Sequence, residues 1–536
     1  MLTMICLVVL LALAVVASEA IADPIPLWGR WSQTFAAVGA APETALQVEL
    51  TAPNGQTRTI LGYWDGGQTW GVRFRPDQEG TWRYRAISAP AVDGLHGRQG
   101  TFSCQRTTAT DRFLQHGPVR VAANGYYLEH SDGTPFFWLG DTVWNGPMLS
   151  ARDDWEIYLG DRVAKRFTLI QFNALAPWRT APTDAEGQVA FTGRDPIQIN
   201  PRYFQRLDER MDAIAAHGLL AVPVLIWSLT AKDPGHYLSE ADCIRLARYQ
   251  VARYGAYHVV WILAGDNHYK NADAERWKRI GRAVFDGQAH APVTTHPTGM
   301  NWPWESWREE RWLDILGYQS GHGDGDAVLR WIHSGPPSQH WQEEPHRPRI
   351  NLEPPYEGHR AYESKQPHTA YTVRRACYWS LLNAPTAGLT YGGHGVWSWH
   401  TAPGQPPTNH GGSGVALTWR EALDLPGSTH MKYLSEWFTS LPWWTLRPAQ
   451  DMLASQPRSD DPARFVAAAR SETGDIAVLY LPVGGAVTLK PGAIGTGSRA
   501  EWFDPRSGQR IPADNADNAF RAPDEQDWVL VLRSAP

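Results

Sequence analysis

The sequence has few cysteines, little net charge and no long apolar run beyond its first residues. Of its four cysteines, Cys6 lies in an N-terminal apolar segment, which leaves Cys104, Cys243 and Cys377, an odd number at wide spacing. This is neither a disulfide framework nor a metal-ligand pattern. We therefore expect a fold of several domains, with cores large enough to be stable without cross-links.

The formal net charge of -6 is small for 536 residues. Nucleic-acid-binding proteins usually carry a basic surface, and proteins that bind acidic membranes usually carry a polybasic segment. The charge therefore argues against a nucleic-acid partner. No later stretch is long and apolar enough to span a bilayer, so no membrane span is expected in the mature chain. The sequence leaves the oligomeric state open.

The first 22 residues are typical of a signal peptide. An apolar run from Met4 to Ala17 precedes Ala20-Ile21-Ala22, which fits a cleavage site, so the mature chain would begin at Asp23. No Lys or Arg precedes the apolar run, and an uncleaved anchor is therefore the alternative. Export with few cysteines indicates a bacterial periplasmic or secreted protein.

Tryptophan, in contrast, is abundant, with 27 residues in the chain. Flat aromatic side chains stack on weakly polar ligands such as sugar rings, but they also fill the cores of β-rich domains. Composition alone does not separate these two interpretations.

The pattern of apolar residues divides the chain into three parts. Residues 23–108 read as short alternating strands separated by turns, which predicts a β-sandwich, and residues 450–536 predict a second, small β-sandwich. Between them, in residues 112–446, apolar runs alternate with amphipathic helices, which is the pattern of a (β/α)₈ TIM barrel. A doubly wound open sheet is the competitor, but no glycine-rich phosphate turn follows the first strand. The expected barrel strands lie within residues 135–144, 167–175, 219–227, 259–268, 292–299, 313–323, 348–358 and 387–399.

Active sites of such barrels lie at the C-terminal ends of the strands, where this sequence gathers carboxylates, amides, imidazoles and aromatic rings. No row of Lys or Arg that could hold phosphate occurs there, and no close His/Asp/Cys set has metal-ligand spacing. Residues 321–326 only faintly resemble a calcium loop, so we expect no metal and no cofactor. Besides the two residues discussed next, the candidate substrate-binding residues at these ends are Asp141, Trp144, Asn173, Trp178, Trp227, Asn267, His268, His296, Gln319, His322, Glu357, Tyr391 and Trp397.

Asp266 and Glu353 end the fourth and seventh expected strands, which face each other across a barrel mouth. Glycoside hydrolysis uses two carboxyl groups across the sugar, about 5 Å apart in retaining enzymes and about 6.5–9.5 Å apart in inverting ones. Asp266 could instead cap a helix, and Glu353 could pair with Arg374 or Arg375. Glu357, four residues further on, is expected to bind substrate or to hold the loop.

Several stretches resemble the apiosidase-like glycoside hydrolase family. They are "FFWLGDTVW", "VVWILAGDNH" and "INLEPPYEG", with "GYWDGGQTWGVRFRPDQEGTWRY" before and "AEWFDPRSGQ" after them resembling β-domains that flank such barrels. The resemblance covers nearly the whole mature chain. It implies a TIM-barrel hydrolase that acts with retention, with Asp266 as acid/base and Glu353 as nucleophile, on a carbohydrate for which apiose-containing pectin is one candidate.

Two other functions remain possible on the sequence. One is a non-catalytic protein that binds a carbohydrate or matrix partner on the same scaffold. The other is a metal-dependent hydrolase built on the histidines.

Overall fold

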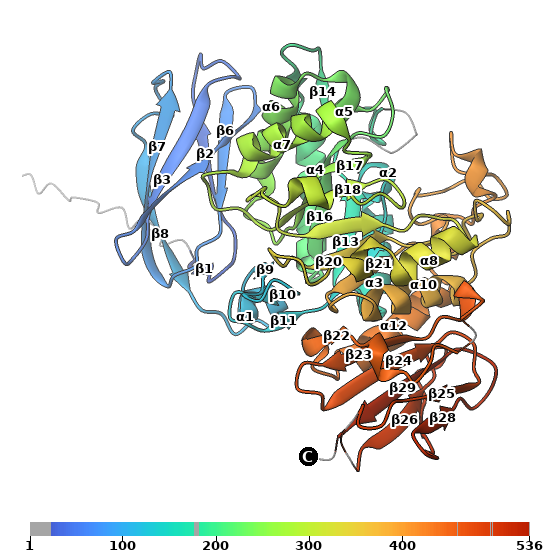
Figure 1. Ribbon diagram of the computed structural model, residues 1–536. Helices are drawn as coiled ribbons and strands as arrows, with labels where there is room; N and C mark the ends of the chain where they lie inside the picture. Colours follow the sequence, from blue (N-terminus) through green and yellow to red (C-terminus); the bar gives the residue numbers. More distant parts are fainter. Residues whose placement is uncertain (1–22, 176–181, 458, 494, 496, 535–536) are drawn as a thin grey trace, which may run out of the picture.

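The computed structural model describes residues 23–175, 182–457, 459–493, 495 and 497–534. A central barrel carries two β-rich regions: the N-terminal region lies beside it at the left of the view, and the C-terminal region packs on other barrel helices at the bottom (Figure 1). The expected multidomain architecture around a TIM barrel is thereby confirmed. The signal-peptide prediction for residues 1–22 and the substrate-binding prediction for Trp178 lie outside the described residues.

The N-terminal region is a sandwich of two antiparallel sheets, apart from one short parallel pairing at its edge. Its alternating strands turn one face inward, where Trp31, Trp70 and Trp82 are buried in a core formed by this region alone. One sheet has the order β1-β8-β7-β3-β4 and the other β2-β6-β5. The strands are β1 (Ile25–Pro26), β2 (Trp31–Ala36), β3 (Ala45–Thr51), β4 (Thr57–Leu61), β5 (Tyr63–Gly66), β6 (Thr69–Phe74), β7 (Gly80–Ala89) and β8 (Gln99–Gln105).

A short segment joins the sandwich to the barrel. It contains α1 (Arg112–His116), capped by Asp111, and a three-stranded sheet of β9 (Val119–Val121), β10 (Leu128–His130) and β11 (Pro135–Phe136). Phe113, Leu128 and Phe136 pack with Leu220 and Ile315 at the N-terminal ends of barrel strands. This segment therefore closes the end of the barrel opposite to the expected active site.

The barrel is a ring of eight parallel strands in the order β18-β17-β16-β13-β12-β21-β20-β19, and β18 and β19 at the two ends of the ladder lie next to each other. Most strand residues are buried on both faces, which is typical of a sheet covered by helices. The strands are β12 (Trp138–Thr142), β13 (Leu169–Asn173), β16 (Leu220–Trp227), β17 (Trp261–Asn267), β18 (Val293–Pro297), β19 (Leu316–Gln319), β20 (Arg349–Glu353) and β21 (Gly388–Tyr391). They match the eight expected strands in order.

Helices cover the outside of this ring, and the strongest sequence signals mark them correctly. Gly218, with φ of 64°, follows the end of α4, and the Ser239 side chain accepts from the Asp242 amide at the start of α6. The helices are α2 (Gly146–Leu149), α3 (Arg152–Ala164), α4 (Pro201–Ala216), α5 (Pro234–Tyr237), α6 (Glu240–Tyr254), α7 (Asn271–Phe285), α8 (Asp326–Ser334), α9 (Pro336–Gln339), α10 (Ala370–Leu382), α11 (Trp419–Ala422) and α12 (Pro426–Phe438); a hairpin of β14 (Phe191–Thr192) and β15 (Gln198–Ile199) precedes α4. Among the described residues, no helix is long and apolar enough to cross a membrane.

The C-terminal region is a six-stranded sheet, β22-β23-β24-β29-β26-β27, with a separate β25-β28 pair. One apolar cluster contains its residues Tyr480 and Phe503 together with Tyr378 of α10 and Trp437 of α12. One face of the sheet therefore shares a core with helices of the barrel, whereas a second cluster, with Val487, Trp502 and Phe520, is formed by this region alone. Its strands are β22 (Leu446–Pro448), β23 (Ala467–Ser471), β24 (Ile476–Leu481), β25 (Ala486–Thr488), β26 (Arg499–Phe503), β27 (Arg510–Pro512), β28 (Ala519–Arg521) and β29 (Trp528–Arg533).

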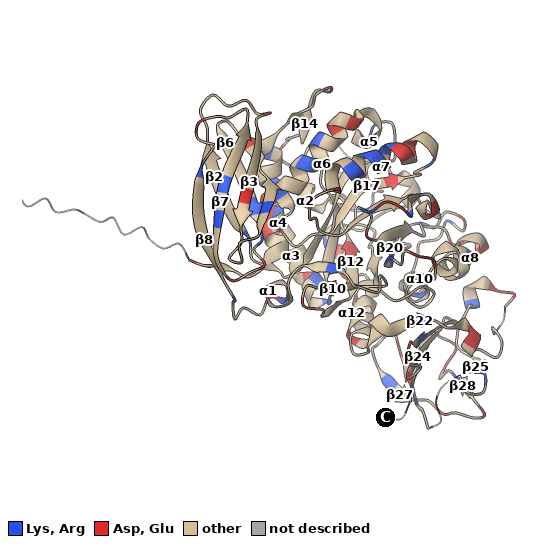
Figure 2. Ribbon diagram, turned by 60° about the vertical axis from the view of Figure 1, so that its left-hand side comes forward, with Lys and Arg blue, Asp and Glu red and all other residues tan. Residues whose placement is uncertain are grey.

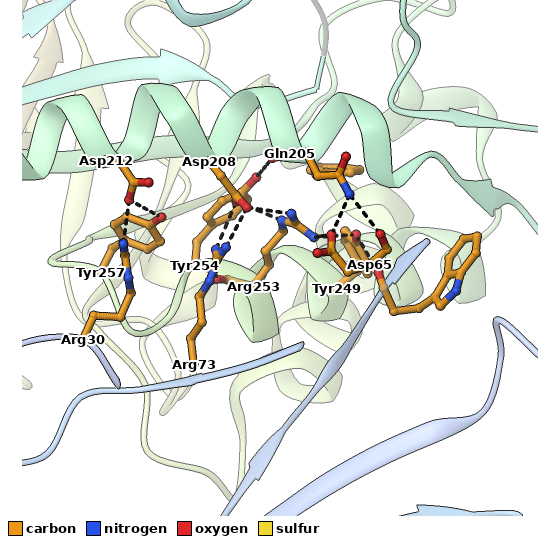
Figure 3. A network of polar contacts seen from close by, with 12 residues as sticks. Arg30, Asp65, Arg73, Gln205, Asp208, Asp212, Tyr249, Arg253, Tyr254 and Tyr257 are labelled. Atoms are coloured by element: carbon orange, nitrogen blue, oxygen red, sulfur yellow. Dashed lines mark hydrogen bonds and ion pairs between the residues drawn. The ribbon is translucent and has the colours of Figure 1, made fainter. Parts of the chain in front are cut away.

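The N-terminal sandwich meets the barrel in a different way, through charged side chains. Arg73 of β6 and Arg253 of α6 both donate to Asp208 of α4, with closest distances of 2.6 Å each, and Arg253 also reaches Asp65 at 2.8 Å (Figure 3). Basic and acidic residues gather where the sandwich faces α4 (Figure 2). Because the Arg253 side chain is fully buried, this network holds the sandwich against α4 and α6.

Candidate active site

Glu353 is the last residue of β20, as the sequence predicts, and only 6% of it is exposed. The ladder between β19 and β20 shifts register here: Tyr318 pairs with Asn351, but Gln319 pairs with Glu353. Such a bulge re-aims the side chains at a strand end. The Asn351 side chain holds the bulge, since its Oδ1 accepts from the Glu353 amide at 3.3 Å while its Nδ2 donates to the Ser320 and Ser380 hydroxyls at 3.0 and 3.1 Å.

Four side chains surround the Glu353 carboxylate. His322 Nε2 lies 2.9 Å from Oε1, and His296 Nε2 lies 3.4 Å from Oε2. Burial raises the pKa of Glu353, while the proximity of His296 and hydrogen bonds from Tyr356 and Gln319 oppose that rise. Neither Arg374, which pairs with Asp527 at 2.6 Å, nor Arg375, which donates to the Ala463 carbonyl, contacts this carboxylate, so the ion-pair interpretation of Glu353 falls away.

Asp266 lies near the end of β17 at a second bulge, since Gly265 pairs with His296 and Asn267 with Pro297, which leaves Asp266 as the extra residue. Its φ of 54° is in the left-handed region, which a residue with a Cβ adopts at a cost of about 1 kcal/mol or more. Its side chain is partly exposed. Asp266 does not cap a helix: α7 begins at Asn271 with Lys270 at its N-cap position.

Packing explains why a glycine, Gly265, precedes Asp266. A Cβ on Gly265 would lie 2.4 Å from the Trp227 ring, so only glycine lets this ring lie against the strand. Local strain continues along the loop, because Tyr269 and Asn271 also have positive φ, 46° and 53°. Strained backbone of this kind gathers at functional sites, where the surrounding structure holds it in place.

Aromatic rings form the top layer of the barrel interior. Trp144 donates from Nε1 to the Tyr356 hydroxyl at 3.1 Å and packs edge-to-face on Trp227 and His296, with centroid distances of 5.2 and 5.5 Å. Trp397 lies at the same level, 6.2 Å from the Tyr356 ring. These three candidate stacking tryptophans are 2–4% exposed, so they build the floor and walls around Glu353.

Several predicted substrate-binding residues lie elsewhere. Asp141 is fully buried on the outer face of β12, where Arg162 and Tyr158 of α3 both donate to its Oδ2 at 2.7 Å. Burial raises the pKa of Asp141, and the Arg162 charge opposes this. The prediction that Asp141 faces substrate is therefore corrected. Successive side chains of a strand point to opposite faces, and that of Asp141 points toward α3, away from the barrel interior.

Glu357 and Tyr391 form another contact, next to the first turn of α12. The Tyr391 hydroxyl and the Gly427 amide both donate to Glu357 Oε2, at 2.6 and 2.8 Å. Gly427 is in the first turn of α12, where a carboxylate satisfies an unpaired amide and the helix dipole. Of the two roles expected for Glu357, the geometry favours the one of holding the loop.

Asn267, Asn173 and His268 complete the predicted set. The Asn267 amide donates to Ser228 and accepts from the Tyr269 backbone, which ties down the loop after Asp266. Asn173 is buried at the end of β13, and His268 is exposed with Nδ1 2.9 Å from the Thr298 hydroxyl. His322, His296, Gln319, Trp144, Trp227 and Trp397 are thus the predicted binding residues that gather around Glu353.

Five residues near Glu353 are not among the predicted ones: Tyr356, Tyr362, His359 and His368 from the segment that follows it, and His410 from beyond β21. The His359 ring stacks on His322 at 4.2 Å, and Tyr362, which is 51% exposed, meets both rings edge-on. His368 donates to the His322 carbonyl at 3.0 Å. His410, from a distant loop, lies 3.5 Å from His359. The stretch "PPYEGHRAY" directly follows Glu353 in the sequence, and this proximity could have identified Tyr356, His359 and Tyr362 as candidates. Within the part of the chain that is described, no group of three or more His, Cys, Asp or Glu side chains is arranged to hold a metal ion.

Comparison with known families bears on this geometry. Residues 122–445, which include all eight barrel strands, match the family described as "Apiosidase-like, catalytic domain". The chain belongs to the apiosidase-like family. This membership confirms the resemblance and makes the protein a glycosidase. Residues 26–89 match DUF5060, a domain of unknown function, and residues 447–533 match "Putative collagen-binding domain of a collagenase".

Solved structures share the fold. A protein named "Glycoside hydrolase" aligns over 78% of this chain and 98% of its own, with a TM-score of 0.68 and 24% identity. A glycoside hydrolase of family 5 from Bacteroides vulgatus gives 0.67 and 23% over 78% of this chain and 93% of its own. A further structure from the same organism aligns over 96% of this chain and 100% of its own, with a TM-score of 0.71 and 18% identity. The comparison with curated proteins found no match.

Proposed function

We propose that this apiosidase-like protein hydrolyses O-glycosidic bonds with retention of configuration, with Glu353 as nucleophile and Asp266 as acid/base. The observation that carries the proposal is the buried Glu353 carboxylate, which donors hold at the mouth of the barrel. Asp266 supports it from β17, three strands away around the ring, on a bulge with left-handed backbone at the end of the strand.

In the first step, a Glu353 oxygen attacks the anomeric carbon as the bond to the leaving oxygen breaks, and Asp266 gives its proton to that oxygen. In the second, Asp266 takes a proton from water, whose oxygen attacks the same carbon and releases Glu353. Two inversions give net retention. The partial exposure of Asp266 suits a group that exchanges protons with water, whereas the burial of Glu353 suits a group that must not.

Around this pair, the barrel mouth offers aromatic faces and neutral polar groups to a sugar. Burial lowers the pKa of His296, although the nearby Glu353 charge opposes this. The buried Gln319 Oε1 has no hydrogen-bond partner among the described residues and can accept from a sugar hydroxyl. Half-exposed Tyr362 offers a ring face at the outer edge. The proposed substrate is a plant or microbial polysaccharide or oligosaccharide, which the protein would meet outside the cytoplasm after export.

The first test replaces each carboxylate by its amide and measures hydrolysis of a panel of activated aryl glycosides. Glu353→Gln should lower kcat/KM by at least about 10⁴-fold, because no ester can form, and Asp266→Asn should lower it by about 10²–10⁴-fold. Product configuration, followed by NMR during the first turnovers of the wild-type enzyme, should be that of the substrate.

Glu357→Gln is the matched control, since it is a buried glutamate in the same loop that contacts α12 and not the Glu353 cluster. It should lose stability but keep most of its turnover. Wild-type-like hydrolysis by folded Glu353→Gln would refute the proposal. A protein that binds a glycan array without releasing product would instead be the non-catalytic binding protein.

A further inference from the structure

His322 makes hydrogen bonds that fix which ring nitrogen carries a proton. Its Nδ1 lies 3.3 Å from the Tyr356 backbone amide, and its Nε2 lies 2.9 Å from Glu353 Oε1. A backbone amide can only donate, so Nδ1 must be the acceptor. The proton of the neutral ring is therefore on Nε2, where it is donated to Glu353.

The same geometry disfavours a charged His322. In the imidazolium both nitrogens carry protons, so Nδ1–H would meet the Tyr356 N–H and that hydrogen bond would be lost. The His359 ring also covers one side of His322. Burial, together with the neighbouring His368, His410 and His394, lowers the pKa of His322 well below its ordinary value.

A loop built over His322 holds it in place. Residues 358–368 fold back on themselves through backbone bonds from Ala361 to Gln366 and from His368 to His359, at 2.8 Å each. The His322 carbonyl accepts from two groups of this loop, the Tyr362 amide and His368 Nε2, both at 3.0 Å. Glu363 accepts from the amides of Asp324 and Gly325 just beyond. The peptide around His322 is thus clamped at several points.

We propose that His322 is a positioning residue: as a neutral imidazole of fixed tautomer, it donates one hydrogen bond that aims Glu353 and favours its ionised form. The proposal rests on the proposed role of Glu353 as nucleophile. His322 is then neither the acid/base nor a cationic partner. The donor offsets part of the cost of burying a carboxylate, and the loop of residues 358–368 preserves its orientation.

Other groups that face Glu353 must be considered when its ionisation is measured. They are His296 from β18, Tyr356 from its own loop and the uncharged Gln319 from β19. Around His322 itself stand His359, His368, His394 and His410. The His359 Nδ1 donates to the Arg360 carbonyl, and His394 accepts from Trp397 at Nδ1, so both are satisfied as neutral rings.

Two substitutions separate the two contacts of His322. In His322→Gln the amide nitrogen replaces Nε2 and can still donate to Glu353, whereas in His322→Asn the side-chain oxygen can accept from Tyr356 but nothing reaches Glu353. Asn should therefore lower kcat on an activated aryl glycoside by about 100-fold with little change in KM, and Gln by no more than about 10-fold. The acidic limb of the pH–rate profile should move to higher pH in Asn and stay in place in Gln, because only Asn removes a donor that favours the carboxylate.

The opposite order, with Asn active and Gln impaired, would show that His322 only holds its loop and would overturn the proposal. His394→Asn is the control: it removes an equally buried imidazole that bonds Trp397 and the Gly414 carbonyl, and it should leave the acidic limb unmoved.

A measurement without substrate tests the tautomer directly. In the full chain labelled with ¹⁵N-histidine, long-range ¹H–¹⁵N correlation should show His322 as the neutral Nε2–H form from about pH 5 to pH 8, with its signals assigned by their loss in His322→Asn. An imidazolium or an Nδ1–H form would overturn the inference. Failure of the proposed function is distinguishable, because it appears as turnover by Glu353→Gln.

Discussion

The two β-rich regions are attached to the barrel mainly by different kinds of interaction. The N-terminal sandwich keeps a core of its own and meets α4 and α6 through the Arg73–Asp208–Arg253 network. The C-terminal sheet also has a core of its own on one face, but its other face packs on the barrel: Tyr480 stacks on Tyr378 of α10 at 4.7 Å and Phe503 on Trp437 of α12 at 5.0 Å. The first interface centres on a charged network, with Tyr63 packed on Tyr249 beside it. The second centres on a shared apolar cluster, which has one buried ion pair, Arg374–Asp527, next to it.

The difference matters because each region contacts a helix that is connected to the strand of one proposed catalytic carboxylate. α6 leads into β17 and Asp266, while Ser380 of α10 accepts from Asn351, which in turn holds the Glu353 amide. Ion pairs fix orientation but contribute little net stability, whereas apolar burial contributes stability with little directionality. We infer that the C-terminal region is the larger source of stability and that the N-terminal network mainly sets the position of α4 and α6.

The largest effect is expected at the apolar interface. Phe503→Ala should lower the free energy of unfolding by about 3–5 kcal/mol, because it removes a buried ring and leaves a cavity against Trp437. Denaturant unfolding followed by tryptophan fluorescence measures this. Phe503→Leu is the control and should cost well under half as much; equal losses in both variants would contradict the shared-core interpretation.

A smaller effect is expected in the charged network. Asp208→Asn should cost about 2–3 kcal/mol, since Arg73 and Arg253 lose a charged acceptor. Burial raises the pKa of Asp208, but hydrogen bonds from both arginines lower it more, so the net pKa is below its ordinary value. This stability is present above the unfolded pKa of about 3.9 and is lost as pH falls through the folded pKa.

The wild-type protein should therefore lose more stability than Asp208→Asn when unfolding is compared at neutral pH and at about pH 3. Phe503→Leu should show the wild-type pH dependence, because no charge changes at its interface. A wild-type protein and an Asp208→Asn variant with parallel pH profiles would show that the network adds no pH-dependent stability.

The smallest effect is expected at the exposed end of the same network. Arg30 lies 2.7 Å from Asp212, but the two side chains are 30% and 52% exposed. Asp212→Ala should cost no more than about 1 kcal/mol, and added salt should reduce the difference further. A loss of stability as large as that of Asp208→Asn would show that the exposure of an ion pair does not determine how much it contributes to stability at this interface.

The sequence predicted much of the barrel because its signals are local. Strand ends rich in polar residues located Glu353 and Asp266, and Ser239 and Gly218 marked helix ends correctly. It could not predict which strand-end residues face the mouth. Both faces of these strands are buried, so no alternation of polar and apolar residues distinguishes the helix side, where Asp141 lies, from the side of Glu353.

The tryptophan question was likewise decided by packing. Twelve tryptophans, among them Trp82, Trp138 and Trp502, are among the largest fully buried side chains, so the excess serves mainly as core. Trp144, Trp227 and Trp397 are also buried, and they lie beside the residues that surround Glu353; that they stack on a sugar stays a prediction.

By itself, the sequence determined the order of elements, the parallel barrel and the placing of Asp266 and Glu353 at strand ends, since periodicity and strand-end composition are written along the chain; their catalytic roles stay a prediction. Only the tertiary structure decided what holds them. The bulges at Asp266 and Glu353 depend on register with neighbouring strands, and the His322 tautomer depends on a backbone amide 34 residues away. Hydrogen bonds between distant segments are set by distance and direction in space, which spacing along a chain does not record.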